Sequence, residues 1–168
     1  IHFKQWQYAK AEAEYKQILE TYGEDREICQ KAARGLIDVY SLGMKQPDLA
    51  NNVVIDYPCA DFTLDEQEAL FYNPGFSAYQ DKNHLEAITS FKKYIEKFPQ
   101  GKFNLDAKFY IADSYGKLGD SLNAVEYFKE IAALATNSYT EESSTFIANY
   151  YYGQENYTDA IPFFEQIE

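Results

Sequence analysis

The sequence predicts an all-α fold in which antiparallel helix pairs stack into a solenoid. Its first indication is a repeated pattern: an alanine, a large apolar residue four positions later and an apolar residue seven positions later. The pattern occurs five times, and consecutive alanines are 39, 37, 37 and 36 residues apart. Periods of this length are typical of stacked supersecondary units. The five alanines are Ala11, Ala50, Ala87, Ala124 and Ala160.

The composition fits long helices that bury wide apolar stripes. Hydrophobic residues make up 46% of the 168-residue chain, and 16 Tyr and 12 Phe stand beside only eight Gly and five Pro. Such a chain can bury a core and lacks the composition of a disordered segment. The spacing of apolar residues predicts nine helices, the first of them a second helix without its partner. Their ranges are about 5–22, 26–42, 47–57, 65–80, 84–97, 103–118, 121–135, 140–153 and 157–168.

Turn and capping residues recur in the same phase of each repeat and support these boundaries. In the third full pair, Gly119 supplies a left-handed residue that ends the first helix, and Asp120 or Ser121 caps the second. Gly43 and Gly153 are expected to end first helices in the same way. Capping-box spacing at the start of first helices occurs at Thr63 with Glu66 and at Ser138 with Glu141.

One proline departs from the repeat. Pro74 falls inside the expected first helix of the second pair, between Asn73 and Gly75. A proline there removes a backbone hydrogen bond and clashes with the preceding turn, at a cost of about 3 kcal/mol. We therefore expect a kink or a late helix start near Pro74, and a packing irregularity and a functional bend are equal alternatives for its cause.

The predicted domain organisation is one solenoid over residues 1–168. It begins with a half repeat at 1–23, and full repeats follow at about 26–58, 64–99, 103–136 and 139–168. The chain starts at Ile1 without a methionine, so we expect a piece of a longer stack. The lost first helix would precede Ile1, and the last helix would continue beyond Glu168.

The arrangement of small and large residues resembles the tetratricopeptide repeat. That motif has small residues at two helix-packing positions and large residues between them. The resemblance covers nearly the whole chain and implies a right-handed superhelix of helix pairs that binds proteins. Its best matches are Ala112, Tyr115, Ala124 and Phe128 in the third unit and Ala148, Tyr151, Ala160 and Phe164 in the fourth.

The junction between the second and third units resembles a particular group of these repeats. Residues 97–103 read Lys-Phe-Pro-Gln-Gly-Lys-Phe, and Asp106 and Ala107 follow. Similar junctions occur in bacterial envelope proteins, such as the periplasmic coordinator of the Tol-Pal system and the lipoprotein of the outer-membrane β-barrel assembly complex. This resemblance implies a bacterial protein in the periplasm or associated with the outer membrane.

Charge and hydropathy exclude two classes of partner. The formal net charge is −12, which repels a nucleic-acid backbone or an anionic membrane surface. There is no run of 18 apolar residues, so direct membrane insertion is not expected.

The sequence contains little that points to catalysis. His2 and His84 are the two histidines, and His84 occupies a turn position that Tyr8 and Tyr157 hold in other units. There is no HExxH, GxSxG or phosphate-binding glycine motif and no zinc-ligand pair. Acidic residues gather at helix starts, where they stabilise the helix dipole. We therefore expect no enzyme activity, no cofactor and no metal ion.

Cys29 and Cys59 are 30 residues apart, without the spacing of a metal site or redox motif. Buried thiols are the favoured interpretation. A disulfide, which would require an oxidising compartment, stays open.

The resemblance also implies where a partner would bind, because first helices line the concave face in this family. Tyr and Phe supply large contact areas, so the second pair is expected to hold the anchors of the interface. An equal alternative is that these rings pack between adjacent pairs. The implied groove residues are Lys31, Arg34, Asp38, Tyr72, Phe76, Tyr79, Phe109, Asp113, Lys117, Thr145, Asn149 and Tyr152.

These observations predict a non-enzymatic protein-interaction module that binds a protein or peptide segment on its first-helix face. A structural or oligomerising scaffold component of a bacterial envelope complex is the alternative function. Self-association through an exposed aromatic face is a third interpretation.

Overall fold

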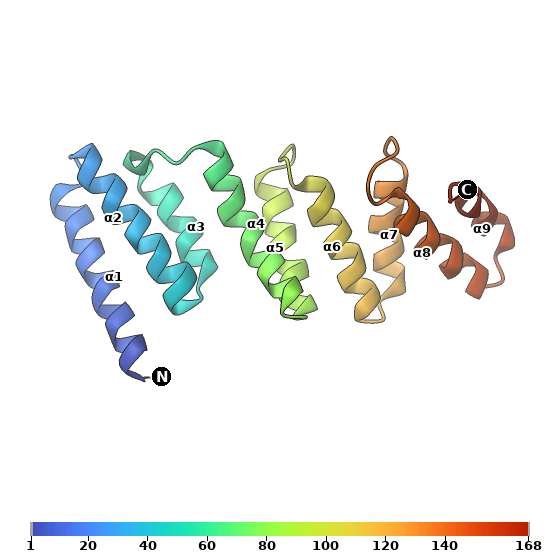
Figure 1. The fold of residues 1–168 in the computed structure, drawn as a ribbon, viewed down its shortest axis with the longest axis horizontal. Coiled ribbons are helices and arrows are strands. Elements are labelled where there is room, and N and C mark those ends of the chain that lie inside the picture. The colour runs from blue at the N-terminus through green and yellow to red at the C-terminus, as the bar shows by residue number, and fades with distance from the viewer. Residues whose placement is uncertain (1, 168) are drawn as a thin grey trace. The chain divides into compact units, whose positions relative to one another are not determined.

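Every regular element of the described chain is helical, as the sequence predicted. The computed structural model describes the backbone of residues 2–167 and the side chains of residues 6–167, so the side chain of His2 lies outside the described residues. The α-helices follow one another along the chain (Figure 1). They are α1 His2–Tyr22, α2 Arg26–Asp38, α3 Pro47–Asp56, α4 Leu64–Gln80, α5 His84–Lys97, α6 Asn104–Lys117, α7 Ser121–Ala132, α8 Thr140–Gly153 and α9 Tyr157–Phe164.

The chain divides into two compact units, residues 1–71 and residues 72–168. The division falls inside α4, between Phe71 and Tyr72 and one turn before Pro74. The expected late helix start is wrong, because α4 runs without a break from Leu64 through Pro74 to Gln80.

In the first unit, α2 is the central helix and packs against α1, α3 and the short 3-10 helix η2, Pro58–Ala60. Its buried face carries Ala32, Ala33 and Leu36. Asp25 caps its start by accepting a hydrogen bond from the backbone N–H of Ile28 at 3.0 Å. This cap holds the helix in register with the core it covers.

The helix α2, the first helix of its pair, does not end at Gly43 as the sequence predicted. After Asp38 the chain continues as a π-helical segment, η1, Val39–Met44, and the left-handed residue is Lys45 with φ 56°. Gly43 has another role, since a Cβ on it would lie 2.5 Å from Cδ1 of Tyr8. The glycine therefore makes room for a ring of α1. Gly119, with φ 79°, ends its helix as predicted.

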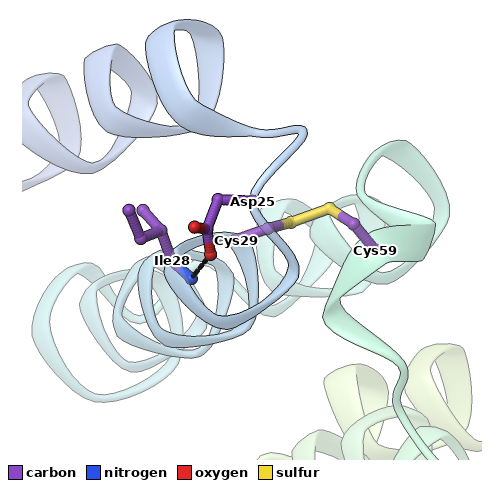
Figure 2. Close-up of a disulfide and its surroundings, with 4 residues drawn as sticks. All are labelled: Asp25, Ile28, Cys29 and Cys59. Atoms are coloured by element: carbon purple, nitrogen blue, oxygen red, sulfur yellow. Dashed lines mark hydrogen bonds between the residues drawn. A yellow bond between two sulfur atoms is a disulfide. The ribbon is translucent and has the colours of Figure 1, made fainter.

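A disulfide joins Cys29, in the first turns of α2, to Cys59 in η2 (Figure 2). The favoured expectation of free buried thiols is thereby corrected, although Cys29 is indeed buried. Sequence reasoning could not pair the two residues, because nothing local shows that η2 folds back beside α2. The bridge fixes the loop between α3 and α4 to the central helix of the first unit.

In the second unit each helix packs against the next, from α5 through α9. The core between them is strongly aromatic, with Phe91, Tyr94 and Phe128 fully buried. Asp120 and Asn156 cap α7 and α9 by accepting from backbone N–H groups three residues later, at 3.2 and 3.4 Å. The Thr63–Glu66 capping box forms as predicted. The expected Ser138–Glu141 box does not, because Tyr139 occupies the N-cap and makes no side-chain cap bond.

Candidate protein-binding face

In the first unit, the predicted groove residues form an exposed polar strip along α2. Lys31 pairs with Glu27 within the same helix at 2.5 Å. Arg34 pairs with Glu66 of α4 at 2.6 Å, and its guanidinium lies 4.8 Å from the ring centroid of Phe62. Asp38 is exposed at the end of the strip. Arg34 is therefore held in place by an ion pair and a ring, whereas Lys31 and Asp38 remain open to solvent.

In the second unit, the aromatic residues expected to anchor a partner are buried or half-buried. Tyr72 is only 8% exposed, and its ring stacks on Phe103 with centroids 4.5 Å apart. Phe76 is half-buried and lies 5.6 Å from the ring of Tyr110. A buried ring offers no surface to a partner, so the expectation for Tyr72 is corrected. The alternative stated for these rings, packing between helix pairs, describes what Tyr72 does.

Phe109 requires the same correction. It is 6% exposed, and its ring stacks on Tyr139 with centroids 4.0 Å apart. The side chain of this first-helix position is covered by the loop that leads into α8. Periodicity alone could not reveal this, because the covering residue comes from the next repeat.

The carboxylate of Asp113, in α6, interacts with side chains from α4 and from its own helix. The hydroxyl of Tyr79, in α4, donates to Oδ2 of Asp113 at 2.8 Å. The ammonium of Lys117 lies 3.6 Å from Oδ1 of the same carboxylate. Three of the predicted groove residues therefore interact in the structure: Asp113 accepts a hydrogen bond from Tyr79 and pairs with Lys117.

A second tyrosine hydroxyl binds a carboxylate nearer the start of α6. The hydroxyl of Tyr139 donates to Oδ1 of Asp106 at 2.8 Å. Burial raises the pKa of both Tyr79 and Tyr139, and the hydrogen bond to a carboxylate raises each pKa further. Both phenols therefore stay protonated and donate at neutral pH. Sequence reasoning missed Asp106 because it was interpreted only as part of the junction motif.

Two more predicted residues occupy the corresponding positions of α8. Thr145 is half-buried, and its hydroxyl donates to the carbonyl of Glu141 at 2.8 Å. Asn149, four residues later and in register with Asp113, is exposed. We call Asp113, Lys117, Thr145 and Asn149 the polar first-helix face of the second unit.

Tyr152 belongs to a different surface. Its ring lies 5.4 Å from Tyr157 and 6.4 Å from Phe164, measured between centroids, so it leans toward α9. All three rings are exposed.

The structure places His84, the histidine whose side chain it describes, beside an aromatic ring. His84 is half-buried, and its ring lies edge-on to Tyr79 at 5.9 Å, which gives it a packing role. Among the side chains of residues 6–167 no group of three His, Cys, Asp or Glu could hold a metal ion. None of the helices seen in the structure has an apolar stretch long enough to cross a bilayer.

Comparison with known proteins agrees with this geometry. Residues 68–101 and 106–138 match the family model of the tetratricopeptide repeat. These stretches cover most of α4 with α5, and α6 with α7, so two of the helix pairs are similar to tetratricopeptide repeats. Such repeats generally mediate protein–protein interaction and are typically non-enzymatic. No curated protein sequence matches the chain.

Solved structures share the fold at low sequence identity. A structure described as MamA AMB-1 is 18% identical with a TM-score of 0.54, covering 99% of this chain and 91% of that one. A crystal structure of MamA is 18% identical with a TM-score of 0.50, covering 95% and 86%. A putative kinesin light chain from Podosopora anserina with TPR-like repeats is 14% identical with a TM-score of 0.47. The two MamA structures, at 18% identity, show that the all-α fold is shared and show nothing about ligands.

Proposed function

We propose that this protein is a non-enzymatic interaction module and that its second unit binds a segment of a partner protein along the polar first-helix face. The observation that carries the proposal is the oriented carboxylate of Asp113, held by Tyr79 and flanked by Lys117. The Asp113 side chain is half-buried and held in a fixed geometry, which gives specificity at low entropic cost because little ordering is needed on binding.

The charge of this face and of the whole chain favours a segment with basic side chains. The chain carries a net charge of −12, and Asp106 and Asp113 lie along α6. Opposite charge on the partner speeds association and suppresses acidic competitors. Asn149 offers an amide that can pair with the backbone of the bound segment.

Site-specific cross-linking tests the binding face. A photoreactive phenylalanine analogue at position 149 should cross-link a defined partner in extracts of the source cells. The same group at position 126, on α7, is the matched control and should not. Asp113→Asn keeps an acceptor for Tyr79 but removes the charge, so it should lower the cross-linking yield at position 149. Equal yields at positions 149 and 126 would rule out this face.

We further propose that the protein works in a bacterial envelope, in the periplasm or at the outer membrane. The Cys29–Cys59 disulfide supports this location, because disulfides persist in oxidising compartments and are rare in the reducing cytosol. The test is acid quenching of intact source cells, followed by alkylation and mass measurement of the protein. Two alkylated thiols would contradict the proposed location.

A further inference from the structure

The helix α4 belongs to both compact units of the chain. The boundary between residues 1–71 and residues 72–168 falls inside it, between Phe71 and Tyr72. A helix of 17 residues usually behaves as one stiff rod, because every turn is hydrogen-bonded to the next. Whether α4 bends at the boundary therefore decides whether the two units can move independently.

The first part of α4 is fixed within the first unit. Glu66 pairs with Arg34 of α2 at 2.6 Å. The side-chain amide of Gln67 donates to the carbonyl of Phe62 at 2.9 Å. Leu70 packs against the core of the same unit. Up to Leu70, α4 is thus held by residues of the first unit.

The second part of α4 is fixed within the second unit. The ring of Tyr72 lies 5.3 Å from that of Phe91 in α5, measured between centroids. A Cβ on Gly75 would lie 2.7 Å from Cδ1 of Phe91, so the backbone of α4 rests directly on that ring. The hydroxyl of Tyr79 donates to Asp113 of α6 at 2.8 Å. From Tyr72 onward, α4 is therefore held by α5 and α6.

Pro74 lies where these two sets of contacts meet. It has no backbone N–H, so the carbonyl of Leu70 receives no hydrogen bond from the residue one turn later. The missing bond would have joined a residue held in the first unit to a residue held in the second. The proline ring also crowds that carbonyl, and sharp bends of helices occur mostly at prolines. The backbone of α4 is therefore weakest at the boundary between the units.

We propose that residues 70–74 of α4 are a hinge about which the two units pivot. Hinges are a few residues that absorb a change in backbone angles while the packed bodies on either side keep their contacts. The ion pair of Glu66, the ring contact of Tyr72 and the hydrogen bond of Tyr79 each lie within one unit, so a bend here leaves them intact. Of the two explanations that the sequence left open for Pro74, the hinge corresponds to the functional bend.

A hinge in α4 has a consequence for binding. The polar strip of α2 belongs to the first unit, and the polar first-helix face belongs to the second. A partner segment that contacts both would bind some bends of α4 better than others and would shift the population toward them. The hinge itself does not depend on a partner, and it is tested without one.

Distances between nitroxide spin labels test the hinge in the whole 168-residue chain. Asn52→Cys in α3 and Asn149→Cys in α8 place one label on each unit, at exposed positions. The native cysteines are joined in the disulfide and take up no label. Double electron–electron resonance should give this pair a distance distribution about twofold wider than that of two pairs within one unit. The pairs within one unit are Glu20→Cys with Asn52→Cys, and Glu96→Cys with Asn149→Cys.

Two proline variants locate the bend. Pro74→Ala restores the N–H that bonds to the carbonyl of Leu70, so the distribution between the units should narrow about twofold, to the width found within a unit. Pro162→Ala is the matched control, because Pro162 also lies inside a helix, but in α9, wholly within the second unit. It should leave the width between the units unchanged. Circular dichroism checks that both variants keep their helices.

Hydrogen exchange of the unlabelled native protein supplies a measurement that needs no variant. Residues 108–113 of α6 are the matched comparison for residues 71–76 of α4, because they lie 37 residues later in the same register and contain no proline. The amides of residues 71–76 should exchange about tenfold faster, since each bend opens the hydrogen bonds around Pro74.

Three results would overturn the proposal. One is a distance distribution between the units as narrow as those within a unit. Another is a width that Pro74→Ala does not reduce, or that Pro162→Ala reduces equally. The third is equal exchange in the two compared stretches of α4 and α6. None of these results depends on the polar first-helix face, which the cross-linking experiment tests separately.

Discussion

Gly75 of α4 lies against the ring of Phe91 in α5, so closely that a Cβ on residue 75 would be 2.7 Å from Cδ1 of that ring. Phe91 is fully buried and also contacts Tyr72 and Tyr110. The ring therefore has no free space into which it could move. The close approach of the two helices requires a residue without a side chain at position 75.

Replacing Gly75 by alanine should lower the free energy of unfolding by about 1–2 kcal/mol, because overpacking outweighs the gain in helix propensity. Urea denaturation followed by circular dichroism measures the change. Gly153→Ala is the matched control, since nothing lies within 4 Å of a Cβ at that position. It should leave stability unchanged or raise it by up to about 1 kcal/mol. Equal effects of both substitutions would show that Phe91 can adjust.

The ion pair between Arg34 and Glu66 should make stability depend on acid pH. Arg34, and then the backbone N–H of Thr63, lower the pKa of Glu66 to about 2 from its usual 4.5. A lowered folded-state pKa stabilises the protein above the unfolded pKa, and this contribution is lost as the pH falls from 4.5 to 2. Both side chains are more than a third exposed, so solvent screening limits the effect to about 1 kcal/mol or less.

Glu66→Gln should therefore unfold at lower urea than the native protein at pH 7, and the difference should vanish near pH 2. Thr63→Ala, which keeps the ion pair, should retain most of the pH dependence. A constant difference between native protein and Glu66→Gln over the whole range would contradict the assigned pKa.

In an alkaline titration, Tyr72, Tyr79 and Tyr139 should lose their protons at a higher pH than free tyrosine. Burial raises the pKa of Tyr72, Tyr79 and Tyr139, and neighbouring carboxylates raise it further. Since the unfolded chain loses these protons near pH 10, the stability present below that pH should be lost as the pH rises. Absorbance at 295 nm should show a late phase that coincides with the loss of helical structure.

Tyr79→Phe isolates one of these groups. It removes the donor to Asp113 and should reduce stability by about 1.5–3 kcal/mol, typical of a hydrogen bond to a charged group. The late phase of the titration should shrink. Tyr157→Phe, at an exposed site, is the control and should leave both measurements unchanged.

Removing the disulfide should destabilise the first unit. Cys29 and Cys59 close a loop with a sequence separation of 30, for which chain entropy predicts a loss of about 3–4 kcal/mol. The double variant Cys29→Ala, Cys59→Ala should unfold at lower urea than the native protein. A reducing agent should lower the stability of the native protein and leave the double variant unaffected. An equal response of both proteins would mean that the bridge is absent in solution.

The helix ranges predicted from the sequence agree with the structure to within a few residues, because local periodicity and capping decide them. Asp120 shows why: its side chain caps the first turn of α7 within three residues of itself. The ends of α2 and the start of α8 were less predictable. Gly43 was interpreted as a helix stop, but the ring of Tyr8, from a different helix, requires the missing side chain.

The candidate binding residues were only partly predictable. Lys117 and Asn149 are exposed on first helices and Asp113 is half-buried, whereas Tyr72 and Phe109 are covered by residues of a neighbouring repeat.

By itself the sequence determined the helical period, the register of the repeats and the all-α fold, because these depend on contacts within one or two turns of helix. Tertiary structure alone decided which rings are buried and that the two cysteines pair. Each of these depends on a side chain that arrives from a distant segment, as Tyr110 does over Phe91.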